Sequence, residues 1–136
     1  MKRGEIYIVQ FDPSVGREYR GYRPALVVQS VELATSPVVT IIPLTSKVEK
    51  AYISDVRIPM SRRNGLAMNS AALVRFIMSY DRSRFMNPDF TKPTAPSPRC
   101  VGVIEDDVMV QIDASLRVHL GLNNEYERSS STHQDQ

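Results

Sequence analysis

The stretch that decides the fold reads G-R-E-Y-R-G-Y-R-P-A-L-V-V-Q-S at residues 16–30 and P-V-V-T-I-I-P-L-T-S at residues 37–46. It contains two nearly continuous apolar runs, at residues 25–28 and 38–44, which are typical of strands buried on both faces. A polar cluster precedes the first run, and another follows the second. If the two strands pair antiparallel, Arg23 and Thr45 meet, and a guanidinium beside a hydroxyl suits a phosphate or a developing oxyanion.

Outward from this stretch, the sequence predicts a succession of short strands. The two apolar runs predict strands at 25–30 and 38–46, and residues 5–11 predict a first strand through their β propensity. Residues 54–60 alternate polar and apolar side chains, as a half-buried strand does. Residues 69–78 favour a fifth strand with Val74, Phe76 and Met78 on one face, a short helix being the alternative. A last short strand is predicted at 80–85.

Two prolines refine these strands. Pro24 restricts Arg23 to an extended conformation at the mouth of the second strand. Pro43 predicts an edge or a bulge near the end of the third, because proline has no amide hydrogen to donate.

The clearest helix is predicted at 105–120. Three acidic residues begin it, Gly121 ends it, and apolar residues recur every four positions at Val108, Ile112, Leu116 and Leu120. One face of this helix is expected to pack on the sheet. Four prolines predict an irregular loop at 86–98, and residues 123–136 predict a disordered tail because they have almost nothing to bury.

The order of the elements indicates the fold class, which is mainly β with α. Five or six short strands followed by one helix favour a strongly curved antiparallel sheet or a small barrel with the helix packed against it. A length of 136 residues favours one domain, expected at 1–122, and a hydrophobic share of 42% allows a real core.

Composition also bears on the setting of the protein. The single cysteine, Cys100, allows no internal disulfide, and no apolar run approaches membrane-spanning length. No signal-peptide pattern stands at the N-terminus, so a cytoplasmic location without membrane contact is expected.

The cationic residues are unevenly distributed, although the net charge is only +2. Arg17, Arg20 and Arg23 lie within seven residues and alternate with Tyr19 and Tyr22. Cations and rings in this arrangement suit single-stranded nucleic acid, since they hold phosphates and stacked bases together.

Several motifs, in order along the chain, resemble the MazF/PemK family, the toxins of type II toxin–antitoxin systems that cut messenger RNA. The matching text is R-G-E-I-Y-I-V-Q-F-D-P at 3–13, G-x-E-x-x-G-x-R-P at 16–24, A-L-V-V at 25–28 and P-L-T-S at 43–46. Weaker matches are S-A-A-L-V, Y-D-R-S-R-F and V-H-L-G-L. The resemblance covers residues 2–122 with one expanded loop, and several ordered motifs are more specific than any single one.

The resemblance implies an SH3-like barrel of the CcdB/PemK type with a C-terminal helix. It also implies a sequence-specific, metal-independent endoribonuclease (an mRNA interferase) that needs no cofactor, forms a homodimer and binds a cognate antitoxin protein. Catalytic roles carry over to Arg23, Thr45 and Glu18, with Arg23 stabilising charge, Thr45 holding a phosphate oxygen and Glu18 a candidate base. The residues predicted to bind RNA are Arg17, Tyr19, Arg20, Tyr22, Ser46 and Arg75.

Alternatives stand beside these roles. Arg75-Phe76 occupies the place of an Asp-Gln pair found in many relatives, and Met78 that of an arginine, which favours a catalytically impaired member that only binds RNA or antitoxin. A CcdB-like toxin acting on a protein such as DNA gyrase is a further alternative. Each catalytic residue also has a purely structural alternative. Arg23 suits a surface ion pair, Thr45 suits a turn that its hydroxyl stabilises, and Glu18 suits an ion-pair partner that orients Arg23.

Overall fold

The computed structural model describes residues 1–13, 15–16, 21–48, 52, 54–93 and 98–122. Its elements are eight strands, three short 3₁₀ helices and one α-helix within these residues. The strands are β1 Glu5–Gln10, β2 Tyr22–Val27, β3 Val38–Thr45, β4 Val56–Ile58, β5 Ser70–Ala72, β6 Met78–Asp81, β7 Phe85–Met86 and β8 Gly102–Val103. The helices are the 3₁₀ helices η1 Val31–Leu33, η3 Val74–Phe76 and η4 Arg82–Arg84, and the α-helix α1 Asp106–His119.

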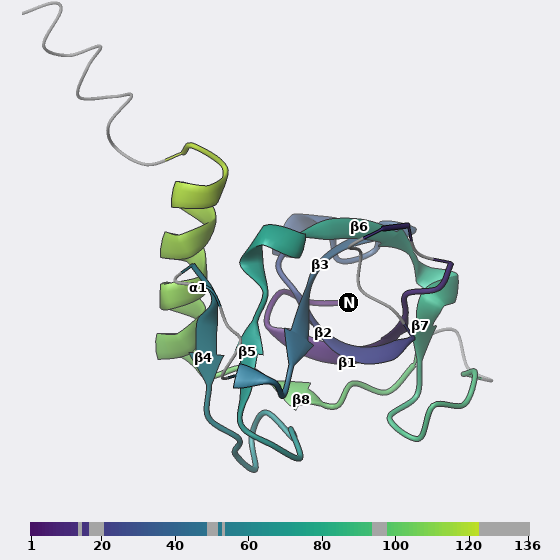
Figure 1. Ribbon diagram of the computed structural model, residues 1–136. Coiled ribbons are helices and arrows are strands. Elements are labelled where there is room, and N and C mark those ends of the chain that lie inside the picture. Colours follow the sequence, from purple (N-terminus) through teal and green to yellow (C-terminus); the bar gives the residue numbers. More distant parts are fainter. Residues whose placement is uncertain (14, 17–20, 49–51, 53, 94–97, 123–136) are drawn as a thin grey trace, which may run out of the picture.

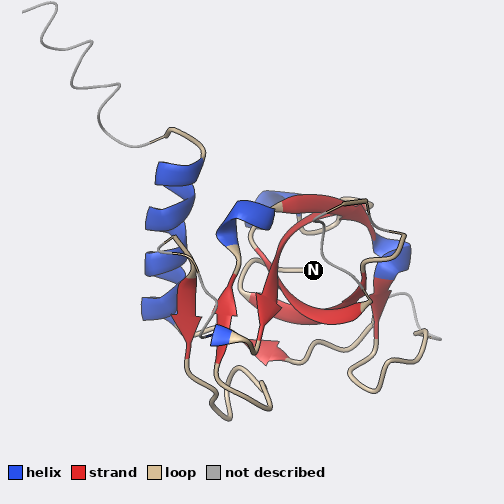
Figure 2. Cartoon of the chain, viewed as in Figure 1, coloured by secondary structure: helices blue, strands red, loops and turns tan. Residues whose placement is uncertain are grey.

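The strands form one curled antiparallel sheet, in agreement with the predicted small barrel. Its order is β4-β5-β3-β2-β1-β7, and β6 and β8 pair with β3 and β1 respectively. Because β6 and β7 are joined only by η4, the strands β1, β2, β3, β6 and β7 close a ring, with β4 and β5 extending the sheet towards α1 (Figures 1 and 2).

Two buried clusters explain why the central strands read as nearly continuous apolar runs. On β1, Tyr7 and Val9 point into the barrel, whereas Ile6 faces the core beneath α1. The barrel cluster contains Tyr7, Val9, Phe11, Ala25, Val27, Val39, Ile41 and Phe85. The other cluster contains Ile6, Leu26, Val28, Ile42, Leu44, Val56, Ile58, Ala72, Val74, Ile104, Val108 and Ile112. Both faces of the central strands are therefore buried, as the sequence predicted.

The predicted helix is confirmed, with an N-cap at Glu105 and a stop at Gly121, whose φ is +72°. Val108 and Ile112 are buried against the sheet, and each contributes about 1.5–3 kcal/mol relative to full exposure. Leu116 packs partly on the same core, but Leu120 is 50% exposed, so the buried face ends one turn earlier than the spacing indicated.

The predicted continuous strand at 69–78 is wrong: the segment contains β5 and then η3, a short 3₁₀ helix in line with the alternative interpretation, and β6 begins only at Met78. Both strands pair with β3. The strand β6 pairs with the residues of β3 up to Ile41, and β5 pairs with those from Leu44 onwards, so Pro43 lies between the two ladders. Proline cannot donate to a ladder, which explains the change of partner at this point. The shared face of Val74, Phe76 and Met78 is therefore wrong as well, because Val74 is buried and Met78 is 40% exposed.

Three smaller boundaries also differ from prediction. The second strand starts at Tyr22 and includes Pro24, which is tolerated because pairing with β3 begins only at Ala25. The strand expected at 80–85 is interrupted by η4, since the Asp81 side chain accepts the Ser83 amide and caps that turn. The two-residue strand β8 was not predicted. Between residues 87 and 98 the described residues form no helix or strand, and the predicted tail lies outside the described residues.

Candidate functional site

The register of the central strands brings Arg23 and Thr45 together. In the β2–β3 pair, Ala25 lies opposite Pro43. Arg23 and Thr45 lie two residues beyond this last pair of the ladder, where continuing the same register sets them opposite each other. Directly opposed residues of antiparallel strands project from the same face about 5 Å apart. The antiparallel pairing on which the sequence argument depended is thus confirmed.

The Thr45 hydroxyl is oriented by the backbone that follows it. Its Oγ1 accepts the amide hydrogen of Lys47 at 3.1 Å, which is the turn that the sequence offered as an alternative. A hydroxyl that accepts one bond still has its own hydrogen to donate and a second lone pair. The turn therefore holds the oxygen in place and leaves it able to donate to an anion. The side chain of Lys47 is itself exposed.

A hollow of about 180 Å³ lies beside Arg23, and its lining includes the two neighbours of Thr45 in the chain, Leu44 and Ser46. Arg23 is exposed at its rim, and the buried side chain of Leu44 contributes an apolar wall. The β4–β5 connection closes the opposite side. The lining residues are Arg23, Pro24, Leu44, Ser46, Leu66, Ala67, Met68 and Ser70. Ser46, predicted to bind RNA, thus shares the hollow with Arg23, whereas no sequence pattern singled out residues 66–68.

Asn64 holds the connection that forms this wall. Its side chain is fully buried and makes four hydrogen bonds: Oδ1 accepts the amides of Ser61 and Leu66, and Nδ2 donates to the Pro59 carbonyl and to Glu105 Oε1. The Ser61 hydroxyl also donates to Glu105. Burial acts to raise the pKa of Glu105, but the hydrogen bonds from Ser61 and Asn64 outweigh it, and the pKa lies below its usual value. A single buried amide therefore ties the wall of the hollow to the start of α1.

Tyr22 contributes an aromatic surface on the same face of β2 as Pro24. Its ring is 45% exposed and meets Phe90 edge to face, with ring centroids 5.9 Å apart and planes at 68°. Phe90 is itself 53% exposed and has a φ of +67°, which is uncommon for a residue with a side chain. The sequence analysis predicted Tyr22 as a stacking residue but missed Phe90, which lies in the proline-rich loop.

Arg75 lies in a different cluster. Its guanidinium carbon is 3.5 Å from the centroid of the Tyr52 ring, and its Nη2 is 3.6 Å from Asp55 Oδ2. The Asp55 side chain is fully buried, so its charge requires a nearby cation. Arg75 is not among the residues that line the hollow beside Arg23. The structure thus gives it a charge-balancing role, and RNA binding by Arg75 stays a prediction.

The remaining predicted residues, Arg17, Glu18, Tyr19 and Arg20, lie outside the described residues. Of the described residues, Gly21 directly precedes β2, and its carbonyl accepts the amide hydrogen of Phe11 at 2.8 Å. Their roles stay predictions.

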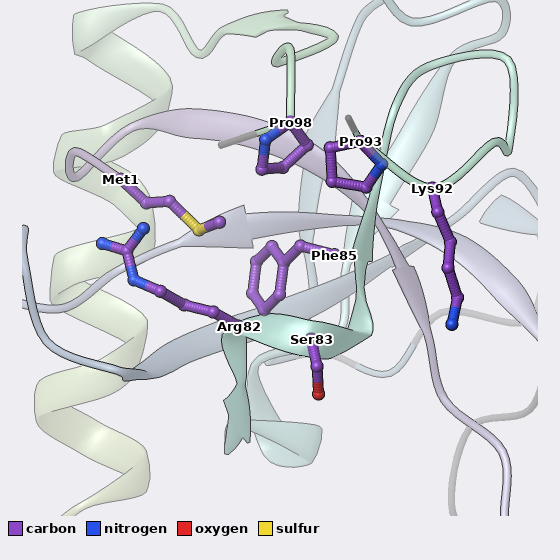
Figure 3. Close-up of a pocket in the computed structure, with 7 residues that line it drawn as sticks. All are labelled: Met1, Arg82, Ser83, Phe85, Lys92, Pro93 and Pro98. Carbon is purple, nitrogen blue, oxygen red and sulfur yellow. The ribbon is translucent and has the colours of Figure 1, made fainter. Parts of the chain in front are cut away.

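A second hollow, of about 300 Å³, lies at the other end of β3 (Figure 3). It is lined by Met1, Arg82, Ser83, Phe85, Lys92, Pro93 and Pro98. The Arg82 guanidinium donates to the carbonyls of Ser36 and Ala34, and the N-terminal amine also donates to Ala34. Figure 3 shows Arg82 and Lys92 on opposite sides of the Phe85 ring, so these cations do not converge on one ligand. The guanidinium of Arg82 and the N-terminal amine are therefore engaged by backbone carbonyls of the chain itself.

Metal ligands and membrane spans were sought among the described residues. No three histidine, cysteine, aspartate or glutamate side chains there lie together as a metal site would require. Within the same part of the chain, no helix is long and apolar enough to cross a bilayer. Metal independence stays a prediction, which a chelator tests directly.

Comparison with known proteins places these features in a family. A family model described as "PemK-like, MazF-like toxin of type II toxin-antitoxin system" matches residues 2–120. Endoribonuclease MazF9 of Mycobacterium tuberculosis is 30% identical over 128 residues, covering 90% of this chain and 98% of that protein. Endoribonuclease EndoA of Bacillus subtilis is 27% identical over 124 residues, covering 90% and 96%.

Solved structures agree with the fold. MazF from Deinococcus radiodurans superposes with a TM-score of 0.68 at 25% identity, covering 89% of this chain and 96% of that one. A mycobacterial endoribonuclease solved in complex with its cognate antitoxin superposes with a TM-score of 0.64 at 17% identity, covering 90% and 97%.

Proposed function

Since the chain belongs to the PemK-like, MazF-like family of toxins from type II toxin–antitoxin systems, we propose that it is an endoribonuclease that cleaves single-stranded messenger RNA at specific sequences. The observation that carries the proposal is the antiparallel β2–β3 register, whose continuation sets Arg23 opposite Thr45, together with the hollow that Arg23 lines. The proposed toxin domain is residues 1–122.

In the proposed reaction the scissile phosphate lies between Arg23 and Thr45. The 2′-oxygen attacks phosphorus while a base removes its proton, and the bond to the 5′-oxygen breaks as that oxygen gains a proton. The products are a 2′,3′-cyclic phosphate and a 5′-hydroxyl. Charge on the non-bridging oxygens increases in the pentacoordinate intermediate, so preorganised donors directed at them lower the barrier.

The roles of the two residues follow from their chemistry. Arg23 is charged at every physiological pH and presents a planar fork of donors, which suits a phosphorane. Thr45 donates its hydroxyl hydrogen to a non-bridging oxygen while its lone pair accepts the Lys47 amide. Glu18 is the proposed base. Arg23 is also the candidate donor of the proton to the 5′ leaving oxygen, and this is the weakest of its roles because arginine is a poor proton donor at its ordinary pKa.

The exposed ring of Tyr22 is proposed to stack a base of the substrate. It lies one residue before Arg23, and aromatic stacking contributes to single-strand binding without requiring a particular base. The partners proposed for the chain are messenger RNA, a cognate antitoxin protein and a second copy of the chain. The proposed location is the cytoplasm.

The test is to incubate the purified protein with a long single-stranded RNA in EDTA and to map the new ends. We expect defined cuts that persist in chelator and vanish in Arg23→Ala. The matched control is Arg117→Ala, which removes the same charge from an exposed position in the last turn of α1 and should cut normally. Absence of cutting by the folded wild type, or unchanged cutting by Arg23→Ala, would overturn the proposal.

A further inference from the structure

Arg57 of β4 lies in the same cross-strand row as Thr45. Thr45 pairs with Ala71 of β5, and Ala71 pairs with Arg57. Side chains of directly paired residues project from one face, so Arg57 and Thr45 share a face, with two strand spacings, about 10 Å, between their backbones. Figure 1 shows β3, β5 and β4 side by side in this order.

Surface shape connects the two residues. A third hollow, of about 170 Å³, is lined by Val48, Arg57, Ile58, Pro59, Asn69 and Ser70. Ser70 also lines the hollow that contains Arg23, so the two hollows adjoin at this residue. An RNA strand bound at Arg23 therefore has a recessed path past Ser70 to Arg57.

The guanidinium of Arg57 retains most of its hydrogen-bonding capacity. Val56 and Ile58 on either side of it are buried, whereas Arg57 is exposed. Its Nη2 donates to the Val48 carbonyl at 3.3 Å, a long bond that occupies one of its five N–H groups. Among the described residues, no carboxylate oxygen lies within 4.0 Å of it. This contrasts with Arg3, Arg63 and Arg75, each of which contacts an aspartate.

A charge on an edge strand also has a simpler use. β4 is the edge of the sheet, and exposed cations there prevent pairing with other chains. That role requires no relation to the site. Protection of the sheet edge, however, does not explain why Arg57 shares a face with Thr45 or why the hollow that it lines adjoins the hollow of Arg23.

We infer that the hollow lined by Arg23 and the hollow lined by Arg57 form one RNA-binding groove. Arg57 is then a positioning residue that binds a phosphate flanking the scissile one. The inference rests on the proposed function. Arg57 does not contact the reacting atoms, so it contributes to substrate binding and to salt dependence rather than to the chemical step.

The test uses RNA oligonucleotides around a mapped cleavage site, with a 2′-deoxy nucleotide at that site for binding measurements. We expect Arg57→Ala to raise Kd and KM about tenfold, as expected for one charge-assisted contact, and to leave kcat within twofold. The slope of log K against log salt should become shallower by about 0.7, the value for one phosphate contact on a single strand. Arg57→Lys should retain part of the affinity, and the control Arg117→Ala should change none of these quantities.

Truncation locates the phosphate. Removing flanking nucleotides one at a time should weaken wild-type binding about tenfold at one step, and Arg57→Ala should not respond to that step. The inference would be overturned if both proteins responded equally to every truncation, or if Kd and the salt slope were unchanged in Arg57→Ala. The remaining roles of Arg57 would then be that of a charge that protects the edge strand or of a contact to a protein partner. These outcomes presuppose cleavage by the wild type and its loss in Arg23→Ala, so failure of the groove is distinguishable from failure of the proposed function.

Discussion

Replacing Asn64 by alanine tests whether one buried amide holds the wall of the hollow. The substitution removes four hydrogen bonds, with distances of 2.9–3.1 Å, and leaves the amides of Ser61 and Leu66 and the carbonyl of Pro59 without that partner. At about 1 kcal/mol for each bond the loss is at most about 4 kcal/mol. Because water entering the vacated space restores part of it, we expect a decrease of about 2–4 kcal/mol in the free energy of unfolding. That is a large share of the ~5–15 kcal/mol of a typical domain.

The assay is urea unfolding followed by circular dichroism, with the m-value compared to exclude a change in the denatured state. The matched control is Asn69→Ala in the same connection, where an exposed side chain accepts the Met60 amide at 2.9 Å. One exposed bond should cost about 0.5–1 kcal/mol. The reasoning is refuted if Asn64→Ala costs less than about 1 kcal/mol or no more than Asn69→Ala.

Three further predictions concern the site and its support. Thr45→Val keeps the shape of the side chain but removes the hydroxyl donor, so kcat for RNA cleavage should fall about 100-fold. Thr45→Ser keeps the hydroxyl, and its kcat should stay much closer to that of wild type. A decrease in kcat below twofold in Thr45→Val would contradict the role of the hydroxyl. The lowered pKa of Glu105 stabilises the fold above the usual value of 4.5, and this contribution is lost as pH falls through the lower folded pKa. Urea titrations between pH 6 and 3 should therefore show less acid destabilisation in Glu105→Gln than in wild type, and parallel curves would contradict it. Gly102→Ala sets a Cβ 2.4 Å from the Asn64 carbonyl and should lower the free energy of unfolding by more than about 2 kcal/mol. Gly121→Ala meets open space, so it should lower the free energy of unfolding only by the ~1 kcal/mol of a left-handed φ. Equal decreases in the stability of the two variants, measured by thermal melts, would refute the packing argument.

Sequence reasoning succeeded where the information is local. Burial on both faces of the central strands is visible as unbroken apolar runs, and the helix is marked by acids at its start and Gly121 at its end. The antiparallel pairing of β2 with β3 could also be predicted, because the two strands are close in the chain. The family motifs lie on these same residues.

Sequence reasoning failed where a segment's structure depends on a distant partner. Residues 69–78 favour a strand or a short helix by local pattern, yet they form β5 and η3, and β6 begins at Met78, on the two sides of Pro43 in their common partner β3. RNA binding by Arg75 stays a prediction, but its contacts with Tyr52 and Asp55 join residues about twenty positions apart and carried no signal in the sequence. Phe90 and Arg57 carried no motif, and only the fold places them near Tyr22 and Thr45.

The sequence by itself thus determined which segments are extended, which faces are apolar, and where the chemically active residues stand along the chain, because periodicity and propensity act over a few residues. The tertiary structure alone decided that β3 pairs with three different strands, that Asn64 ties residues 59–66 to Glu105, and that Arg57 shares a face with Thr45. The physical reason is that cross-strand register and buried hydrogen bonds join residues far apart in the chain, and no local pattern specifies which partner a strand or a buried amide selects.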